Sequence, residues 1–162
     1  YIVYGGSVFV IFASIYHWYP KITGRMLNEH LGRLHFLLTF VGFNLCFAPQ
    51  HWLGLNGMPR RVAEYDPQFE LVNQISSAGA LLMAISTLPF LWNVIASAFY
   101  GSIAGDNPWR ALTPEWLTTS PPPVENWKGE APLVTHPYGY GTPADEIDLR
   151  SASGSDLWRG GQ

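Results

Sequence analysis

Residues 71–105, LVNQISSAGALLMAISTLPFLWNVIASAFYGSIAG, contain no Asp, Glu, Lys or Arg. Residues 1–20 and 34–57 are also free of these four residue types, and the three runs together hold about half of the chain. A bilayer core about 30 Å thick is crossed by roughly 20 apolar residues in a helix, so each run is long enough to span it. The sequence therefore predicts an all-α membrane protein.

The composition of the 162-residue chain supports the same class. The chain is 48% hydrophobic and only 13% charged, whereas about a quarter of a typical soluble domain is charged. The formal net charge of −3 and the absence of a basic patch predict no nucleic-acid partner. The chain opens on Tyr1 and is apolar from that residue, so we expect a fragment of a longer protein.

The three charge-free runs predict three transmembrane helices, at about 1–19, 34–55 and 72–100. Residues 1–105 then form a three-helix transmembrane segment. Residues 106–162 hold eight of the 13 prolines and predict a polar, irregular, cytoplasmic tail.

The connections between the runs suggest an orientation. The link Lys21–Arg33 contains three Lys or Arg residues and one Glu. This excess of positive charge marks the link as cytoplasmic by the positive-inside rule. The next link, residues 57–70, then lies outside. Pro20 is expected to end the first helix, because proline disfavours the helical conformation of the residue before it.

Polar and small residues inside the runs predict helix packing. The stretch Ser76–Ala80 consists of small residues that permit close helix approach, and Thr39 and Asn44 are expected to bond between helices. Cys46 is the only cysteine and is expected to be a buried packing residue.

The histidines do not predict a metal site. His35 and His51 are 16 residues apart, which places them about 160° apart around a straight helix. We expect packing or interfacial roles for both, and the same for His17 and His30. His136 lies in the tail without a partner motif.

The adjacent residues Arg60 and Arg61 are the strongest candidate binding group. They follow Pro59 at the outer end of the second predicted helix, where two guanidiniums can bind carboxylates or phosphates bidentately. The residues alone leave two alternatives open. The pair can reach lipid headgroups, or it can pair with Glu64 and Asp66.

Several motifs resemble the last three membrane helices of subunit I of the heme-copper oxidases, especially the bacterial and cyanobacterial cytochrome c oxidases. The similarity covers about residues 1–127 and rests on these stretches: IYHWYPKITGRMLNE (15–29), HF…VGFNL (35–45), PQHWLGLNGMPRR (49–61), LPFL (88–91), NPWRAL (107–112) and SPPPVEN (120–126).

The resemblance implies the last three helices of a twelve-helix bundle and a role for the arginine pair. In the family such a pair binds the propionates of two hemes, which assigns Arg60 and Arg61 as cofactor-binding residues. The heme and copper ligands of the family are not among these residues. The resemblance therefore implies no catalytic and no metal-ligating residue here, and a fragment that is inactive alone.

The implied parent is a proton-pumping terminal oxidase that reduces oxygen to water with electrons from cytochrome c. Its implied partners are the remainder of subunit I, subunits II and III, cytochrome c and the lipid bilayer of a bacterial plasma or thylakoid membrane. Two alternatives stay open: a quinol-oxidising subunit I, which the run Tyr65–Phe69 resembles, and a non-catalytic three-helix membrane module. Val62 departs from the tyrosine that often follows the arginine pair in this branch.

Overall fold

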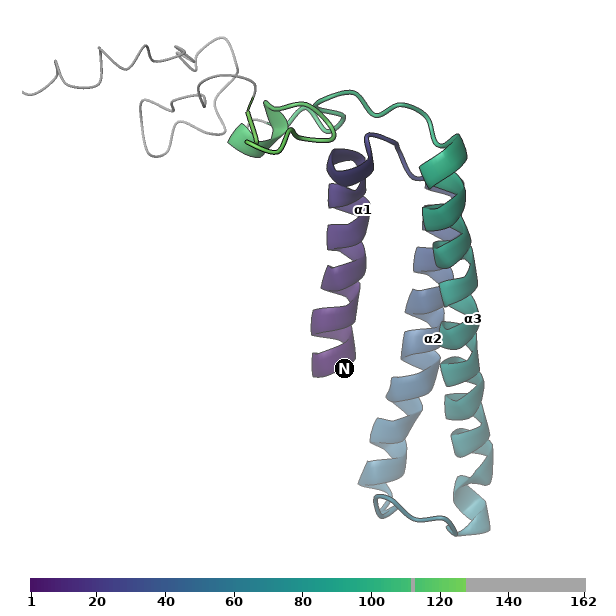
Figure 1. The fold of residues 1–162 in the computed structure, drawn as a ribbon. Coiled ribbons are helices and arrows are strands. Elements are labelled where there is room, and N and C mark those ends of the chain that lie inside the picture. Colours follow the sequence, from purple (N-terminus) through teal and green to yellow (C-terminus); the bar gives the residue numbers. More distant parts are fainter. Residues whose placement is uncertain (112, 128–162) are drawn as a thin grey trace, which may run out of the picture. The chain divides into compact units, whose positions relative to one another are not determined.

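The computed structural model describes residues 1–111 and 113–127 (Figure 1). Its helices, in chain order, are η1 (Tyr4–Val8), α1 (Phe9–Thr23), α2 (Glu29–Leu55), η2 (Pro67–Phe69), α3 (Glu70–Tyr100) and η3 (Pro114–Trp116). Apart from the helices, the described residues contain one isolated β-bridge, between Arg25 and Ile103. The all-α prediction is confirmed.

Two of the described helices are long and apolar enough to cross a membrane: α2, and α3 together with η2. The 27 residues of α2 span about 40 Å at 1.5 Å per residue. The expected first span, about residues 1–19, covers η1 and α1 as far as Tyr19, and its crossing of the bilayer stays a prediction. Helices α2 and α3 run side by side in opposite directions (Figure 1).

Close packing of α2 against α3 depends on two glycines. A Cβ atom added at Gly79 would lie closer than 3.0 Å to the backbone of Cys46, and one added at Gly42 would meet the backbone nitrogen of Met83 at 2.9 Å. Cys46 and Met83 are buried there together with Phe43. The predictions of close packing at the small-residue stretch and of a packing role for Cys46 are confirmed.

Polar side chains also join the two helices. The Thr39 hydroxyl lies 2.9 Å from Ser86 Oγ and donates to the carbonyl of His35 at 2.7 Å. Ser76 Oγ donates to the Cys46 carbonyl at 2.7 Å. The expected interhelical bond of Thr39 is therefore present, which spares a polar group from unsatisfied burial.

At the start of α2, one buried amide fixes the chain. The side chain of Asn93, fully buried on α3, accepts from the backbone N–H of Asn28 at 2.8 Å and donates to its carbonyl at 2.9 Å. The side chain of Asn28 in turn accepts from the N–H of Leu31 at 3.1 Å and caps the helix.

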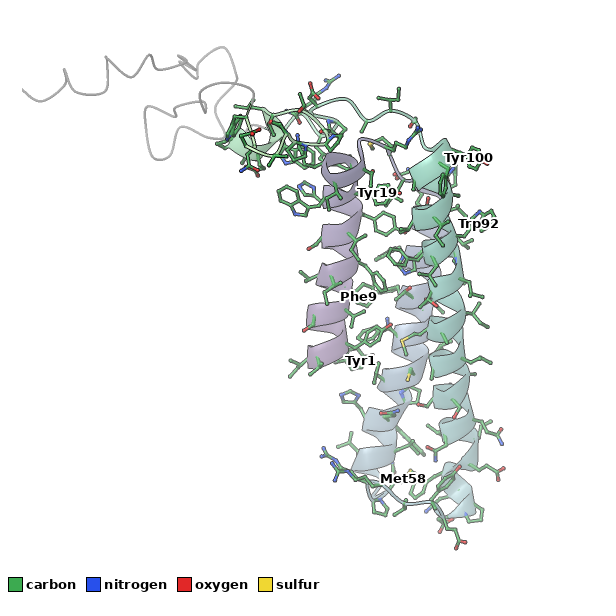
Figure 2. The ribbon with its side chains drawn as sticks, viewed as in Figure 1. Tyr1, Phe9, Tyr19, Met58, Trp92 and Tyr100 are labelled. Atoms are coloured by element: carbon green, nitrogen blue, oxygen red, sulfur yellow. The ribbon has the colours of Figure 1, made fainter. Side chains whose placement is uncertain are left out.

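The N-terminal residues pack on α2 through aromatic rings. Tyr1 meets Phe43 edge-on at 4.7 Å, and Phe9 meets the same ring at 5.5 Å. The Tyr1 hydroxyl also donates to Asn44 Oδ1 at 3.0 Å, so Asn44 bonds to the N-terminal segment. Figure 2 shows Tyr1 and Phe9 at successive levels of the N-terminal helix.

The chain forms two compact units. One contains Tyr1–Ser14 and Leu27–Tyr100, and the other contains Ile15–Met26 and the described residues from Gly101 onward. In the second unit, residues 24–26 pair with 102–104: Met26 N–H donates to the Ser102 carbonyl at 2.8 Å and Ala104 N–H to that of Gly24 at 3.0 Å.

The expectation that Pro20 ends the first helix is wrong, because α1 continues to Thr23. A proline removes only one N–H donor, and two hydrogen bonds hold the turn that follows it. Thr23 Oγ1 donates to the Tyr19 carbonyl at 2.8 Å, and Gly24 N–H donates to that of Pro20 at 2.8 Å. Gly24, with φ of +73°, then ends the helix.

Candidate functional site

The candidate site begins where α2 ends. The N–H of Met58 donates to the Leu53 carbonyl at 3.0 Å, and that of Gly57 donates to the Gly54 carbonyl at 3.2 Å. These two bonds, with φ of +88° at Gly57, form a Schellman motif, which needs a left-handed residue that glycine adopts without steric cost. The motif turns the chain out of the helix and into the arginine pair.

Arg60 and Arg61 line a cavity of about 640 Å³ beside the end of α2. Arg61 adopts a left-handed conformation with φ of 59°, which is uncommon for a residue with a side chain. Successive side chains of an extended chain point to opposite sides, so this turn helps both arginines to face one cavity. The other lining residues are Tyr1, Phe47, Gln50, His51, Leu53, Gly54, Met58, Pro59 and Asn73.

Hydrogen bonds hold the polar walls of the cavity. Gln50 Nε2 donates to Ser76 Oγ at 3.0 Å, and Asn73 Nδ2 donates to the Phe69 carbonyl at 3.1 Å. His51 Nδ1 lies 2.9 Å from the Phe47 carbonyl, so this nitrogen carries a hydrogen. Side chains from α2 and α3 thus surround the cavity in fixed positions.

Among the described residues that line the cavity there are two arginines and no acid. Within the part of the chain that the structure describes, the ion pair Arg33–Glu29 is the one present, so neither Arg60 nor Arg61 is paired. The Asp66 carboxylate accepts instead from the N–H of Gln68 at 3.0 Å. The alternative in which Glu64 and Asp66 neutralise the arginines is therefore not observed, and the pair remains available for an external anion.

The other residues considered from the sequence are not brought together. His35 is buried against the rings of Phe12 (4.5 Å) and Phe90 (5.0 Å), as expected for a packing histidine. His51 lines the cavity, whereas His35 does not. Among the described residues, no group of His, Cys, Asp and Glu could hold a metal ion. His136 lies outside the described residues.

Sequence reasoning missed two features of this end of α2. The Asn56-Gly57 pair after an apolar run is a signal for a glycine-capped helix end, and it could have located this turn. Gln50 and Asn73 gave no signal, because single amides in apolar runs become site residues only when helix packing places them together.

These observations define a class: a helical membrane segment with a cavity at one end of a helix pair, whose described lining contains two arginines and no acid. The chain belongs to the family described as cytochrome c and quinol oxidase polypeptide I, which matches residues 1–82. The resemblance drawn from the motifs is therefore confirmed.

Individual relatives agree with the family. The chain is 60% identical to cytochrome c oxidase subunit 1 of Thermostichus vulcanus over 142 residues, which cover 87% of this chain and 26% of that protein. It is 53% identical to cytochrome c oxidase subunit 1 of Synechocystis sp. over 148 residues, which cover 91% of this chain and 27% of the relative. A probable cytochrome c oxidase subunit 1-beta of Nocardia farcinica is 50% identical over 78% of the chain and 22% of its own length. The chain thus spans about a quarter of the length of these relatives.

Proposed function

We propose that this chain is part of the catalytic subunit of a proton-pumping terminal oxidase that reduces oxygen to water with electrons from cytochrome c. The names of the relatives, cytochrome c oxidase subunit 1, support this activity for the whole subunit. The residues in hand contribute scaffold and anionic-group binding, and the heme and copper ligands lie elsewhere in the complete subunit.

Arg60 and Arg61 hold the propionates of two hemes in this proposal. The observation that carries it is the cavity of about 640 Å³ that both arginines line and whose described lining contains no acid. Arginine stays charged in a partly dry site, and its planar fork matches a carboxylate, so the donor set fits this group. When bound, the hemes supply electron transfer and oxygen chemistry.

The remaining residues support the arginines. The glycine-capped end of α2 fixes where the segment with Arg60 and Arg61 (the arginine loop) begins. The hydrogen bonds of Gln50 and Asn73 fix two walls of the cavity. The positive charges of both guanidiniums offset the negative charge of the bound carboxylates. The carboxylates are thereby stabilised in their ionised form near the edge of the membrane.

Residues 1–105 form the transmembrane segment with three spans in this proposal, and residues 106–162 form the cytoplasmic tail. The partners are the rest of subunit I, subunits II and III, cytochrome c and the bilayer. The membrane is a bacterial plasma membrane or a thylakoid membrane. The apolar side chains that α3 exposes, such as Trp92 and Tyr100 (Figure 2), suit contact with neighbouring helices or lipid.

The propionate role is tested by Arg60→Leu and Arg61→Leu in the complete oxidase, with Arg33→Leu as the control. Arg33 is an exposed arginine near the start of α2, the helix that precedes the arginine pair. We expect altered heme absorption and lower turnover in both loop variants and parent-like behaviour in the control. Unchanged heme spectra and turnover in the loop variants would refute the role.

The electron donor has a separate test, because the family description covers both cytochrome c and quinol oxidases. We expect the purified parent complex to oxidise reduced cytochrome c. Oxidation of quinol alone would replace cytochrome c as the donor, and a complex without bound heme would support the non-catalytic module instead.

A further inference from the structure

Lys21, in the last turn of α1, contacts both ends of one loop. Its ammonium donates to the backbone carbonyl of Asp106 at 3.0 Å and to that of Thr118 at 2.7 Å. The side chain is buried, with 5% of the residue exposed. A buried ammonium is costly unless its donors are satisfied, and here two backbone oxygens accept from two of its three N–H groups.

Asp106 and Ser120 are also joined directly by hydrogen bonds. The N–H of Ser120 donates to Asp106 Oδ1 at 3.1 Å, and its hydroxyl donates to the Asp106 carbonyl at 3.1 Å. The Asp106 carbonyl thus accepts hydrogen bonds from both Lys21 and Ser120. The Lys21 ammonium lies where the two ends of the loop meet.

The Lys21 ammonium also contacts an aromatic ring, which belongs to a larger aromatic cluster. Lys21 Nζ lies 5.0 Å from the ring centre of Trp116, which is 1% exposed, and a cation over an indole face is attracted by the ring. Trp18 stacks on Trp116 at 5.6 Å, and the Trp109 indole N–H donates to the His17 carbonyl at 3.0 Å. The last turns of α1 and the loop therefore share one aromatic cluster, formed by His17, Trp18, Trp109 and Trp116.

The bonds of Lys21 go to backbone oxygens and not to a carboxylate. Across residues 1–111 and 113–127, Lys21 forms no ion pair with Asp106 or Glu115, although both acids are near enough to favour its charge. The contact therefore depends on N–H donors at the end of a long side chain. A change of either acid to its amide leaves both acceptors of Lys21 in place.

We propose that Lys21 is a positioning residue that holds residues 106–111 and 113–120 closed on the end of α1 and so fixes the buried Trp116. The inference is independent of the heme proposal, because every residue in it belongs to the unit formed by Ile15–Met26 and the residues after Tyr100.

Hydrogen exchange on the intact complex tests the clamp. The backbone N–H groups of Trp116 and Leu117 report loop opening, because they donate to the carbonyls of Thr113 (3.1 Å) and Pro114 (2.9 Å). In Lys21→Met, which keeps the length but lacks donors, we expect these amides to exchange roughly ten- to a hundredfold faster, as for the loss of a charge-assisted hydrogen bond.

Two further variants separate a clamp from a general loss of structure. Asp106→Asn keeps the carbonyl that accepts from Lys21, so we expect exchange within about threefold of the parent. Arg33→Met removes an exposed cation from another helix and serves as the folding control. Parent-like exchange in Lys21→Met would overturn the proposal. So would faster exchange in Asp106→Asn equal to that in Lys21→Met, since it would assign the contact to the carboxylate.

Discussion

At the residue scale, a few side chains determine how closely α2 and α3 approach. Gly79 leaves no room for a Cβ atom against the backbone of Cys46, whereas Gly54 in the same helix pair has open space around it. Thr39 bonds across the interface, whereas Thr87 bonds within its own helix. These pairs allow one residue to be tested against a matched residue of the same type.

Gly79→Ala should destabilise the helix pair by about 1–3 kcal/mol, because the added methyl group must move backbone atoms. Gly54→Ala should be neutral or stabilising, since alanine favours the helix over glycine. Thermal unfolding of the complex in detergent measures both. Equal stability of the two variants would show that the close approach at Gly79 carries no energetic weight.

Thr39→Val should cost about 0.6–2 kcal/mol, because it leaves Ser86 without its interhelical bond. Thr87→Val provides the control, as its hydroxyl is exposed and donates to the Ala84 carbonyl three residues back. The same unfolding experiment compares them, and a larger loss in Thr87→Val would contradict the assignment.

At the element scale, the sequence predicts the apolar length of each span better than the length of each helix. The second charge-free run starts at Leu34, but α2 begins at Glu29. The extra turn is polar, capped by Asn28 and joined by the Arg33–Glu29 pair at 3.1 Å, so hydropathy does not detect it. Pro20 shows the same limit, since bonds made by Thr23 and Gly24 extend the helix past it.

The sequence likewise predicts one part of the candidate site and not the other. The arginine pair is visible in the sequence because two adjacent cations at the end of an apolar run are unusual. The cavity is not visible, because Gln50 and Asn73 come from different helices and meet only through the packing of α2 on α3. The loop contacts of Lys21 span even longer separations along the chain, and no local pattern predicts them.

The turn at the end of α2 gives a prediction for the site. Gly57→Ala should cost about 1 kcal/mol, because φ of +88° is unfavourable for a residue with a Cβ atom although space is open around it. The arginine loop should shift with it, and heme absorption should change. Parent-like heme absorption in Gly57→Ala would contradict the view that this turn positions Arg60 and Arg61.

Lys21 lies beyond the first apolar run and gives a pH prediction. Burial lowers the pKa of Lys21 from its usual value of 10.5, against the opposing charges of Asp106 and Glu115. The closed loop therefore binds fewer protons than the open loop between the lowered pKa and 10.5, so rising pH favours closure in that window. The neutral amine keeps two N–H donors for the two carbonyls.

Amide exchange of Trp116 and Leu117, corrected for its intrinsic pH dependence, measures this effect. Protection should increase as pH rises through the lowered pKa, and Lys21→Met should abolish the trend. Loss of protection over the same range in the parent protein would give the opposite sign and contradict the account.

At the scale of the whole molecule, the three long apolar runs carry no Asp, Glu, Lys or Arg, and the charged residues lie between the runs and after residue 105. The long apolar runs supply helix packing, and the candidate binding residues Arg60 and Arg61 follow the end of α2. The chain spans about a quarter of its relatives, so in our proposal the oxygen chemistry belongs to the complete subunit and anion binding belongs to this part.

The most direct test of that division is a redox titration of both hemes in the complete oxidase that carries Arg60→Leu or Arg61→Leu. A nearby positive charge favours heme reduction, so each variant should lower a heme midpoint potential by on the order of tens of millivolts, while Arg33→Leu leaves both potentials unchanged. Midpoint potentials equal to those of the parent in both loop variants would contradict the assignment of Arg60 and Arg61 to the heme propionates.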